Sequence, residues 1–301
     1  MRFENYQPTK NLQADALIDL QTVDPTDIFE ILSEAIRLKV AAKVGEVNNT
    51  LQNKKIVLIT NQKLGLAQLT FRLSVVGLGA EPITVQLGGS GIEAFLGAKE
   101  TTQTLSRLGI DAFVVETGLY KDAETLYKQL YKPVINAFDG DSPCDALSML
   151  FSVHERLGKL SNLNVAYLSE GNKIDSTLSA FIKCGLNITF VCPEDKKPTE
   201  EIFNYAAAHV HAHVEHDLDK ALQSCDVLFI DNEFGESYKI TKEKLKLLSR
   251  DACVLHPTPL TGKLDADIDI LDDNRSLIAN FGANLVYIQS AILELLLDNN
   301  Y

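Results

Sequence analysis

Three histidines alternate along one short segment of the chain, HVHAHVEH at residues 209–216. The apolar residues between them predict a β-strand over residues 208–216, and successive side chains of a strand point to opposite faces. His209, His211 and His213 would therefore share one face, where imidazoles can ligate zinc, nickel or copper. An exposed edge strand with a polar face gives the same pattern, and neighbours on one strand seldom converge on one ion. The segment is a candidate metal site with this structural alternative.

Other common catalytic signatures are missing from the sequence. It contains no glycine-rich nucleotide loop, no Ser/His/Asp arrangement and no Cys-x-x-Cys pair. The sequence GLGAEP at residues 77–82 follows a predicted helix rather than a strand, which indicates a helix-ending turn. The five cysteines are far apart and mostly lie in apolar segments, so we predict reduced thiols that pack in the core. No cofactor is predicted.

Composition narrows the class of protein. The chain has 301 residues, of which 46% are hydrophobic, enough for two domains with sizeable cores. Acidic residues outnumber basic ones by 41 to 28, a formal charge of -13, which argues against nucleic acid or an anionic membrane as a partner. The N-terminus MRFENYQPTK lacks the apolar core of a signal peptide, and we expect no membrane-spanning run. The predicted location is the cytoplasm.

Short apolar runs alternate with helical patterns along both halves of the chain. A helix capped by Thr26 or Asp27 is predicted through about residue 43. Strands are then predicted from Lys55, Pro82, Asp111 and Pro133, with a helix from about Leu66 to Leu78. Strands joined by helices in this rhythm form parallel sheets. A turn near residue 141 is predicted to end the first domain.

The second half repeats the rhythm and completes the predicted fold. Strands are predicted from Asn164, Asn187, Ala208, Asp226 and Ala252, and the apolar stretch from residue 284 reads as a closing helix. The predicted class is α/β, with two doubly wound parallel-sheet domains joined by interdomain helices. We predict a first domain at residues 1–141, completed by residues 284–301, and a second at residues 142–283.

Several segments resemble one protein family over nearly the whole chain. Residues 132–172, KPVINAFDGDSPCDALSMLFSVHERLGKLSNLNVAYLSEGN, are similar to the stretch that links the two domains of aspartate/ornithine carbamoyltransferases. VLHPTPL at residues 254–260 resembles the family's His-Pro-x-Pro loop, and NLVYIQSAILELLL resembles its closing helix. LGLAQLTFRLSVVGLGAEPITV, from residue 64, matches the frame around its phosphate-binding helix. The loop lacks the cysteine of the ornithine branch, which places the resemblance nearer the aspartate branch.

The resemblance implies a carbamoyl phosphate site in the first domain, an amino-acid site in the second, and a trimer whose subunits share sites. The family holds the phosphate with Ser-Thr-Arg-Thr-Arg at a helix N-terminus, where amides, hydroxyls and guanidinium groups meet. The matching positions here are Leu64, Gly65, Leu66, Ala67 and Gln68. None of these residues offers a hydroxyl or a cation, so the predicted phosphate site is degenerate.

Other matched positions have also changed. A pocket arginine of the family corresponds to Glu116, and the His-Pro-x-Gln helix start reads Ser142, Pro143, Cys144, Asp145. Two arginines that bind the amino acid correspond to Asp175 and Asn232. The basic residues of the family's site are therefore replaced in this chain, whereas the predicted strands, turns and segment lengths match those of the family.

Three matched features keep their residue types, namely Lys99, the loop at residues 256–259 and the Asp139-Gly140 turn. Lys99 resembles a loop lysine that a neighbouring subunit donates, with a solvated surface lysine as the alternative. The loop of His256, Pro257, Thr258 and Pro259 is a candidate pocket wall, although such loops are also retained for shape alone.

These substitutions predict a protein that does not bind carbamoyl phosphate. A buried carboxylate in place of a pocket arginine costs a bound dianion several kcal/mol. The first hypothesis is a non-catalytic pseudoenzyme, a binding or regulatory homologue that forms a homotrimer, contacts other protein subunits or holds an unidentified small molecule. One alternative is an enzyme with a changed substrate that uses Glu116, Asp145 and Asp175. The other is a true aspartate carbamoyltransferase.

Overall fold

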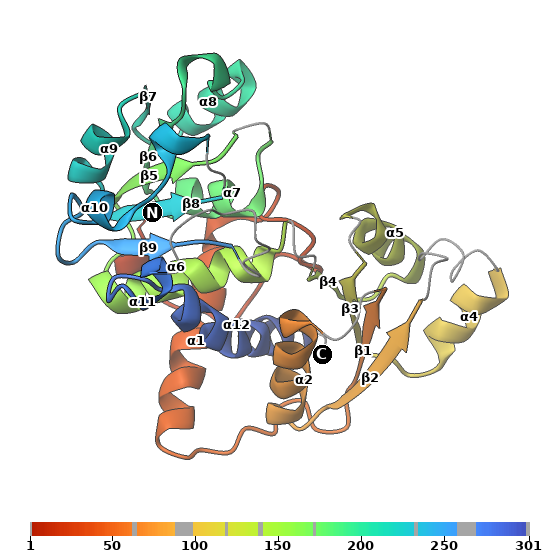
Figure 1. Cartoon of the computed structure of the whole chain (residues 1–301). Helices are drawn as coiled ribbons and strands as arrows, with labels where there is room; N and C mark the ends of the chain where they lie inside the picture. The colour runs from red at the N-terminus through yellow and green to blue at the C-terminus, as the bar shows by residue number, and fades with distance from the viewer. Residues whose placement is uncertain are drawn as a thin grey trace. The chain divides into compact units, whose positions relative to one another are not determined.

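The computed structural model describes residues 2–61, 65–87, 99–117, 120–137, 141–170, 173–231, 234–257 and 269–298. The chain forms two compact units (Figure 1). The first-sheet unit comprises residues 7–147 and 284–301, and the second-sheet unit comprises residues 1–6 and 148–283. The division falls inside α6 (Pro143–Leu157) and α12 (Ile278–Asp298). Each unit contains a parallel sheet with helices, so the predicted α/β class is confirmed.

The first-sheet unit is built on a four-stranded parallel sheet in the order β2-β1-β3-β4. Its central strands are almost fully buried, which explains why they read as continuous apolar runs. The strands are β1 (Lys55–Thr60), β2 (Glu81–Gln86), β3 (Ala112–Glu116) and β4 (Val134–Asn136), and the helices wholly within the unit are α1 (Pro25–Lys43), α2 (Leu66–Gly77), α4 (Lys99–Arg107) and α5 (Tyr120–Leu130).

Helix α1 begins slightly earlier than the sequence predicts. Its N-cap is Asp24, whose side chain accepts a hydrogen bond from the Thr26 amide at 2.8 Å. Pro25 occupies the first helical position, where its missing amide costs no helical hydrogen bond. The predicted cap at Thr26 or Asp27 is therefore wrong by two or three residues.

Two carboxylates on α1 hold the extended segment that precedes it. Glu30 is 1% exposed and accepts hydrogen bonds from the Thr9 amide at 2.9 Å and the Lys10 amide at 2.5 Å. Asp27, one turn earlier, accepts one from the Gln13 amide at 2.9 Å. Two buried carboxylates of α1 thus fix the backbone of the segment that precedes the helix.

The second-sheet unit contains a five-stranded parallel sheet in the order β7-β6-β5-β8-β9. Aromatic rings from two of its strands stack at its centre, with the Tyr167 and Phe229 centroids 4.8 Å apart. The strands are β5 (Asn164–Leu168), β6 (Asn187–Val191), β7 (Ala212–Glu215), β8 (Val227–Ile230) and β9 (Cys253–Leu255), and the helices are α7 (Ser176–Lys183), α8 (Glu200–Ala207), α9 (Leu218–Ser224), α10 (Lys242–Leu245) and α11 (Asp269–Asp272), with 3-10 turns at η1 (Phe3–Asn5), η3 (Glu194–Lys196) and η4 (Glu236–Tyr238).

Two sequence expectations about apolar residues have different outcomes. All five cysteines are free and buried, as predicted for packing thiols. By contrast, the sequence predicts no membrane-spanning run, but α12 is long and apolar enough to cross a membrane by length and composition alone. In its most apolar stretch of 18 residues, 72% is buried inside the protein, as is usual for the core helix of a folded domain.

The N-terminal turn η1 belongs to the second-sheet unit. The Glu4 carboxylate accepts hydrogen bonds from the amides of Leu160 at 2.7 Å and Ser161 at 3.0 Å. Burial alone would raise the pKa of Glu4, but these hydrogen bonds outweigh burial and lower the pKa to about 2. The ionised carboxylate therefore stabilises the folded state.

Glu4→Gln is expected to lower the free energy of unfolding by about 1 kcal/mol near pH 7, a value reduced for solvent screening of this exposed side chain. The folded pKa lies below the reference value of 4.5, so the stabilisation is present above that value and is lost as pH falls toward 2. Urea unfolding at several pH values should show the two proteins converging in acid. An equal difference at neutral and acid pH would contradict the assignment.

Candidate functional site

The carboxyl edge of the first sheet gathers buried polar side chains. Thr60 and Glu116 end β1 and β3 as direct register partners, and each is 3% exposed. Asn136 ends β4 opposite Val115 and is 1% exposed. Ligands of open parallel sheets bind outside this edge. Glu116, which the resemblance matches to a pocket arginine of the family, is thus a buried carboxylate at this edge.

Helix α2 begins beside this edge of the sheet. Gly65 is its N-cap and contributes no side-chain hydrogen bond, and the first turn consists of Leu66, Ala67 and Gln68. Leu66 is 47% exposed, whereas Gln68 is 5% exposed. The amides of a first helical turn attract an anion, but without a neighbouring cation that attraction is weak and easily screened.

Gln68 and Glu116 both line a very small cavity. It has a volume of about 10 Å³, room for roughly one water molecule. The Nε2 atom of Gln68 is buried and has no hydrogen-bond partner among the described residues. Among the described residues, the cavity that these two side chains line is too small for a substrate.

Ser142 and Asp145 form the start of helix α6. The Ser142 hydroxyl accepts a hydrogen bond from the Asp145 amide at 3.3 Å, which is the geometry of an N-cap. Cys144 between them is buried, and burial raises the pKa of its thiol well above the usual range, so this thiol is unreactive. The segment that resembles the family's His-Pro-x-Gln helix start therefore serves as a helix cap here.

Five of the predicted site positions lie wholly or partly outside the described residues. Lys99 is the first residue of α4, and its side chain lies outside the described part of the chain. Four further predicted positions also lie outside the described residues, namely Leu64, Asn232, Thr258 and Pro259.

In the second-sheet unit, Asp175 has a structural role. Its side chain caps α7 by accepting a hydrogen bond from the Leu178 amide at 2.8 Å. The buried Tyr167 hydroxyl also donates to it, at 3.4 Å. Burial, followed by the charge of Asp175, raises the pKa of Tyr167 well above its usual range. The position that resembles an amino-acid-binding arginine thus carries a helix cap.

His256 follows β9 and is 8% exposed, and Pro257 after it is half-buried. Burial lowers the pKa of His256 more than the nearby Asp231 carboxylate raises it, which favours a neutral imidazole. Its Nδ1 atom is buried without a hydrogen-bond partner in the described structure. Asp231 comes directly after β8, the strand next to β9. We did not single it out from sequence, although an aspartate directly after a buried strand is a recognisable signal.

The structure does not bring the three candidate metal ligands together. β7 begins only at Ala212, so His209 lies in the turn after α8, where its Nδ1 atom is 2.8 Å from the Tyr205 carbonyl oxygen. The rings of His211 and His213 stack with centroids 5.6 Å apart. Among the described residues no group of three histidine, cysteine or acidic side chains could hold a metal ion. The expectation that all three share one strand face is therefore wrong.

Family models match both halves of the chain. Residues 16–155 match the model described as "Aspartate/ornithine carbamoyltransferase, carbamoyl-P binding domain". Residues 161–296 match "Aspartate/ornithine carbamoyltransferase, Asp/Orn binding domain". Together the two models account for most of the sequence.

Individual proteins agree with these models. An ornithine carbamoyltransferase of Pyrococcus abyssi is 26% identical over 308 residues, which cover 95% of this chain and 97% of the relative. One from a Parafrankia species is 29% identical over 269 residues, covering 82% and 84%. Both relatives belong to the ornithine branch, so the preference for the aspartate branch stays a prediction.

Solved structures show the same fold. The ornithine carbamoyltransferase of Pyrococcus furiosus superimposes with a TM-score of 0.82 at 23% identity, over 95% of this chain and 98% of that one. An aspartate transcarbamoylase of Trypanosoma cruzi in complex with carbamoyl phosphate gives 0.80 at 19% identity, over 96% and 97%. With both family models matched along its length, this chain belongs to the aspartate/ornithine carbamoyltransferase family.

Proposed function

We propose that this protein is a non-catalytic member of the family, a binding or regulatory homologue that does not hold carbamoyl phosphate. The observation that carries the proposal is Glu116, a carboxylate 3% exposed at the end of β3. A dianion placed beside a buried carboxylate loses about 3–5 kcal/mol relative to a site with a cation there. That loss corresponds to an affinity more than about a hundredfold weaker.

The start of α2 supports the same conclusion. Gly65, Leu66, Ala67 and Gln68 supply no hydroxyl and no positive charge, and the side chain of Gln68 is turned into the core. An enzyme with a changed substrate is less well supported, because Asp175, one of the three carboxylates that it would use, is engaged as the cap of α7. This carboxylate is therefore not available as a reacting group without loosening the helix.

Calorimetric titration and a paired activity assay test the proposal. We expect no saturable heat with carbamoyl phosphate or phosphonacetyl-aspartate up to about 10 mM, and no carbamoyl transfer to aspartate or ornithine. An active family member assayed in parallel shows that the reagents are sound. Measurable turnover with either amino acid would overturn the proposal.

The same proposal includes a homotrimer located in the cytoplasm. Membership of the family supports this expectation. A trimer of 33.2 kDa chains would have a mass of about 100 kDa by light scattering.

A further inference from the structure

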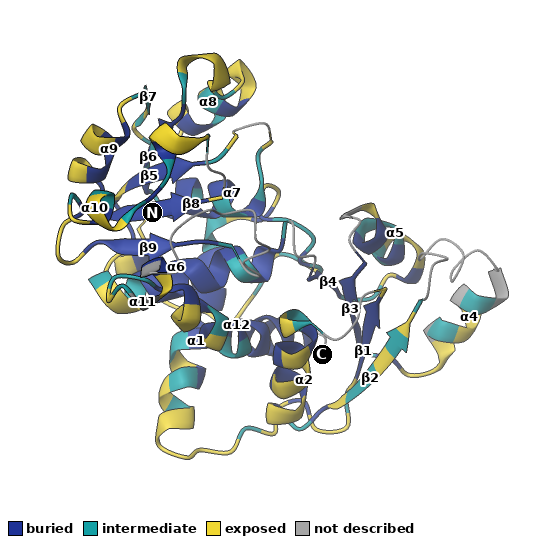
Figure 2. Cartoon of the chain, in the orientation of Figure 1, coloured by how far each residue is buried: buried dark blue, intermediate teal, exposed yellow. Residues whose placement is uncertain are grey.

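Two histidines of the second-sheet unit, His211 and His213, lie side by side at the start of the edge strand β7. The order of the sheet ends with β7, which pairs with β6 alone among the described strands (Figure 1). Both histidines are exposed, whereas Ala212 and Val214, which alternate with them, are partly buried (Figure 2). The imidazole pair is therefore accessible to dissolved ions.

The backbone of both histidines is fixed by the neighbouring strand. The His211 carbonyl oxygen accepts a hydrogen bond from the Ile188 amide at 2.9 Å, and His213 is the register partner of Thr189. Because residues two apart on a strand point to the same face, the two imidazoles lie on one side of the sheet. The Thr189 hydroxyl lies on this side as well, 3.5 Å from Nε2 of His213. The pair thus stands on hydrogen-bonded strands rather than on a free loop.

The separation of the two rings is close to that of two imidazoles bound to one ion. Their centroids are 5.6 Å apart, and their planes are inclined by 26°. Two imidazoles on a tetrahedral zinc ion, with Zn–N bonds of about 2.0–2.1 Å, have centroids roughly 5.2 Å apart. Since both side chains are exposed, a small rotation of each suffices to direct one ring nitrogen at a common ion. The convergence that neighbours on a strand usually lack is nearly present here.

The surrounding groups are engaged elsewhere. The carboxylate of Glu215, next on the same face, pairs with Lys220 and accepts a hydrogen bond from the His216 amide at 3.0 Å. This ion pair also offsets the charge of Lys220, which would otherwise repel a cation. The Nδ1 atoms of His209 and His216 lie 2.8 and 2.7 Å from backbone carbonyl oxygens. Within the described part of the chain, the rings of the pair have only the long contact with the Thr189 hydroxyl.

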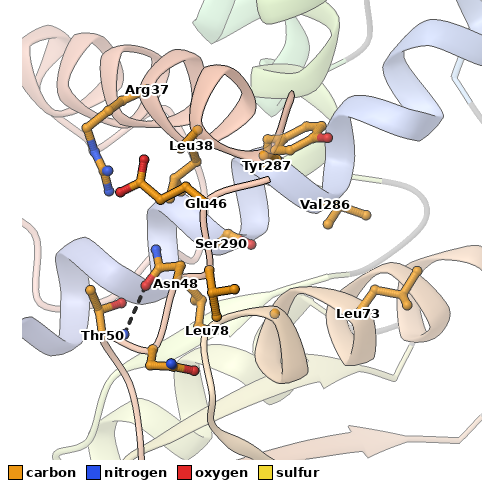
Figure 3. A pocket seen from close by; sticks show the side chains of 15 residues that line it. Arg37, Leu38, Glu46, Asn48, Thr50, Leu73, Leu78, Val286, Tyr287 and Ser290 are labelled. Carbon is orange, nitrogen blue, oxygen red and sulfur yellow. Dashed lines mark hydrogen bonds between the residues drawn. The ribbon is translucent and has the colours of Figure 1, made fainter. Parts of the chain in front are cut away.

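A cavity of about 590 Å³ in the first-sheet unit is less suited to hold a specific ligand (Figure 3). Arg37 is the one cation among its described lining residues, and its guanidinium group already pairs with Glu34 and Glu294. An anionic ligand would have to displace these carboxylates. The imidazole pair, by contrast, would give up only the Thr189 contact on binding an ion.

We propose that His211 and His213 chelate one divalent transition-metal ion, with water in the remaining coordination positions. Imidazole nitrogen suits zinc, copper and nickel, whereas magnesium and calcium prefer oxygen ligands. Two protein ligands leave the ion open to solvent, so the site differs from a structural zinc site, which has four protein ligands. The proposal goes beyond the proposed function and is independent of it, because these two histidines lie outside the positions matched to the family's site.

Calorimetric titration of the untagged protein with zinc chloride tests the proposal. Wild type is expected to bind one ion with micromolar affinity. His211→Gln and His213→Gln should each weaken binding at least about a hundredfold, because two linked ligands exceed a single ligand by about that factor. His209→Gln, the matched control at an exposed histidine before the strand, should keep the wild-type affinity. Electron paramagnetic resonance of bound Cu²⁺ should show coupling to two nitrogens in wild type and to one in each pair variant.

Three results would overturn the metal site. These are no saturable binding by wild type below about 1 mM zinc, equal affinity in wild type and both pair variants, and an equal loss in the His209 control. Urea midpoints are expected to agree among the four proteins, since exposed substitutions change stability little. Such agreement assigns the loss of affinity to the missing imidazole rather than to unfolding.

Discussion

Glu116→Arg is expected to lower the free energy of unfolding by about 4 kcal/mol and to leave carbamoyl phosphate unbound. The substitution restores the residue type that the family resemblance places at this position. The side chain there is 3% exposed, and the neighbouring cavity holds roughly one water molecule. A guanidinium group is larger than a carboxylate and would be buried beside Gln68 without a matched anion. The family's arginine therefore no longer fits.

Urea denaturation of the purified variants measures this effect. Glu116→Gln preserves the shape of the side chain and removes only its charge, so it serves as the matched control and should retain most of the stability. Calorimetry with carbamoyl phosphate provides the second measurement. An arginine variant as stable as wild type, or one that binds the ligand, would show that the site is still adapted to a cation.

Glu30→Ala is expected to cost about 3 kcal/mol of stability. Its buried carboxylate accepts hydrogen bonds from the amides of Thr9 and Lys10, and its removal leaves both donors without this partner and opens a gap in the core beside α1. Lys10 also has a φ of 60°, a left-handed conformation that a residue with a side chain adopts only when its surroundings hold it there. The loss should be visible as a lower urea midpoint.

The matched control is Glu201→Ala, at an exposed glutamate in the first turn of α8. It should change stability by less than about 0.5 kcal/mol, because surface carboxylates contribute little. Hydrogen exchange at residues 9 and 10 should accelerate in the Glu30 variant alone. Unchanged exchange there would mean that the segment is held by other contacts.

The sequence predicted the fold well where apolar periodicity was strong. The helix expected from Leu66 to Leu78 is α2, Leu66–Gly77, and the strand expected from Lys55 is β1, Lys55–Thr60. Boundaries were less predictable. The alternation at residues 208–216 indicated one strand, but Thr199 caps α8 so that the helix and its turn include His209. The helix that Thr199 begins therefore extends close to residues whose alternating pattern had indicated a strand.

The candidate site was predictable only in part. The sequence indicated that Glu116 follows a predicted strand, and the structure has it as the last residue of β3; its match to a pocket arginine of the family stays a prediction. The cap roles of Ser142 and Asp175 depend on backbone geometry that residue identity alone does not reveal. The opposite orientations of Leu66 and Gln68 were equally hidden, since α2 offers apolar residues on both faces and its sequence does not indicate which face packs inward.

The N-terminal turn has a practical consequence for dissecting the protein. Phe3 is 8% exposed and meets the ring of His154 edge-on at 5.0 Å, within the second-sheet unit, although the sequence that follows belongs to the other unit. Neither half can therefore be excised as one uninterrupted gene fragment. A separately expressed second half should carry residues 1–6 on a flexible linker. Without them, the apolar residues that pack against Phe3 and the two amides bound by Glu4 would be exposed to water.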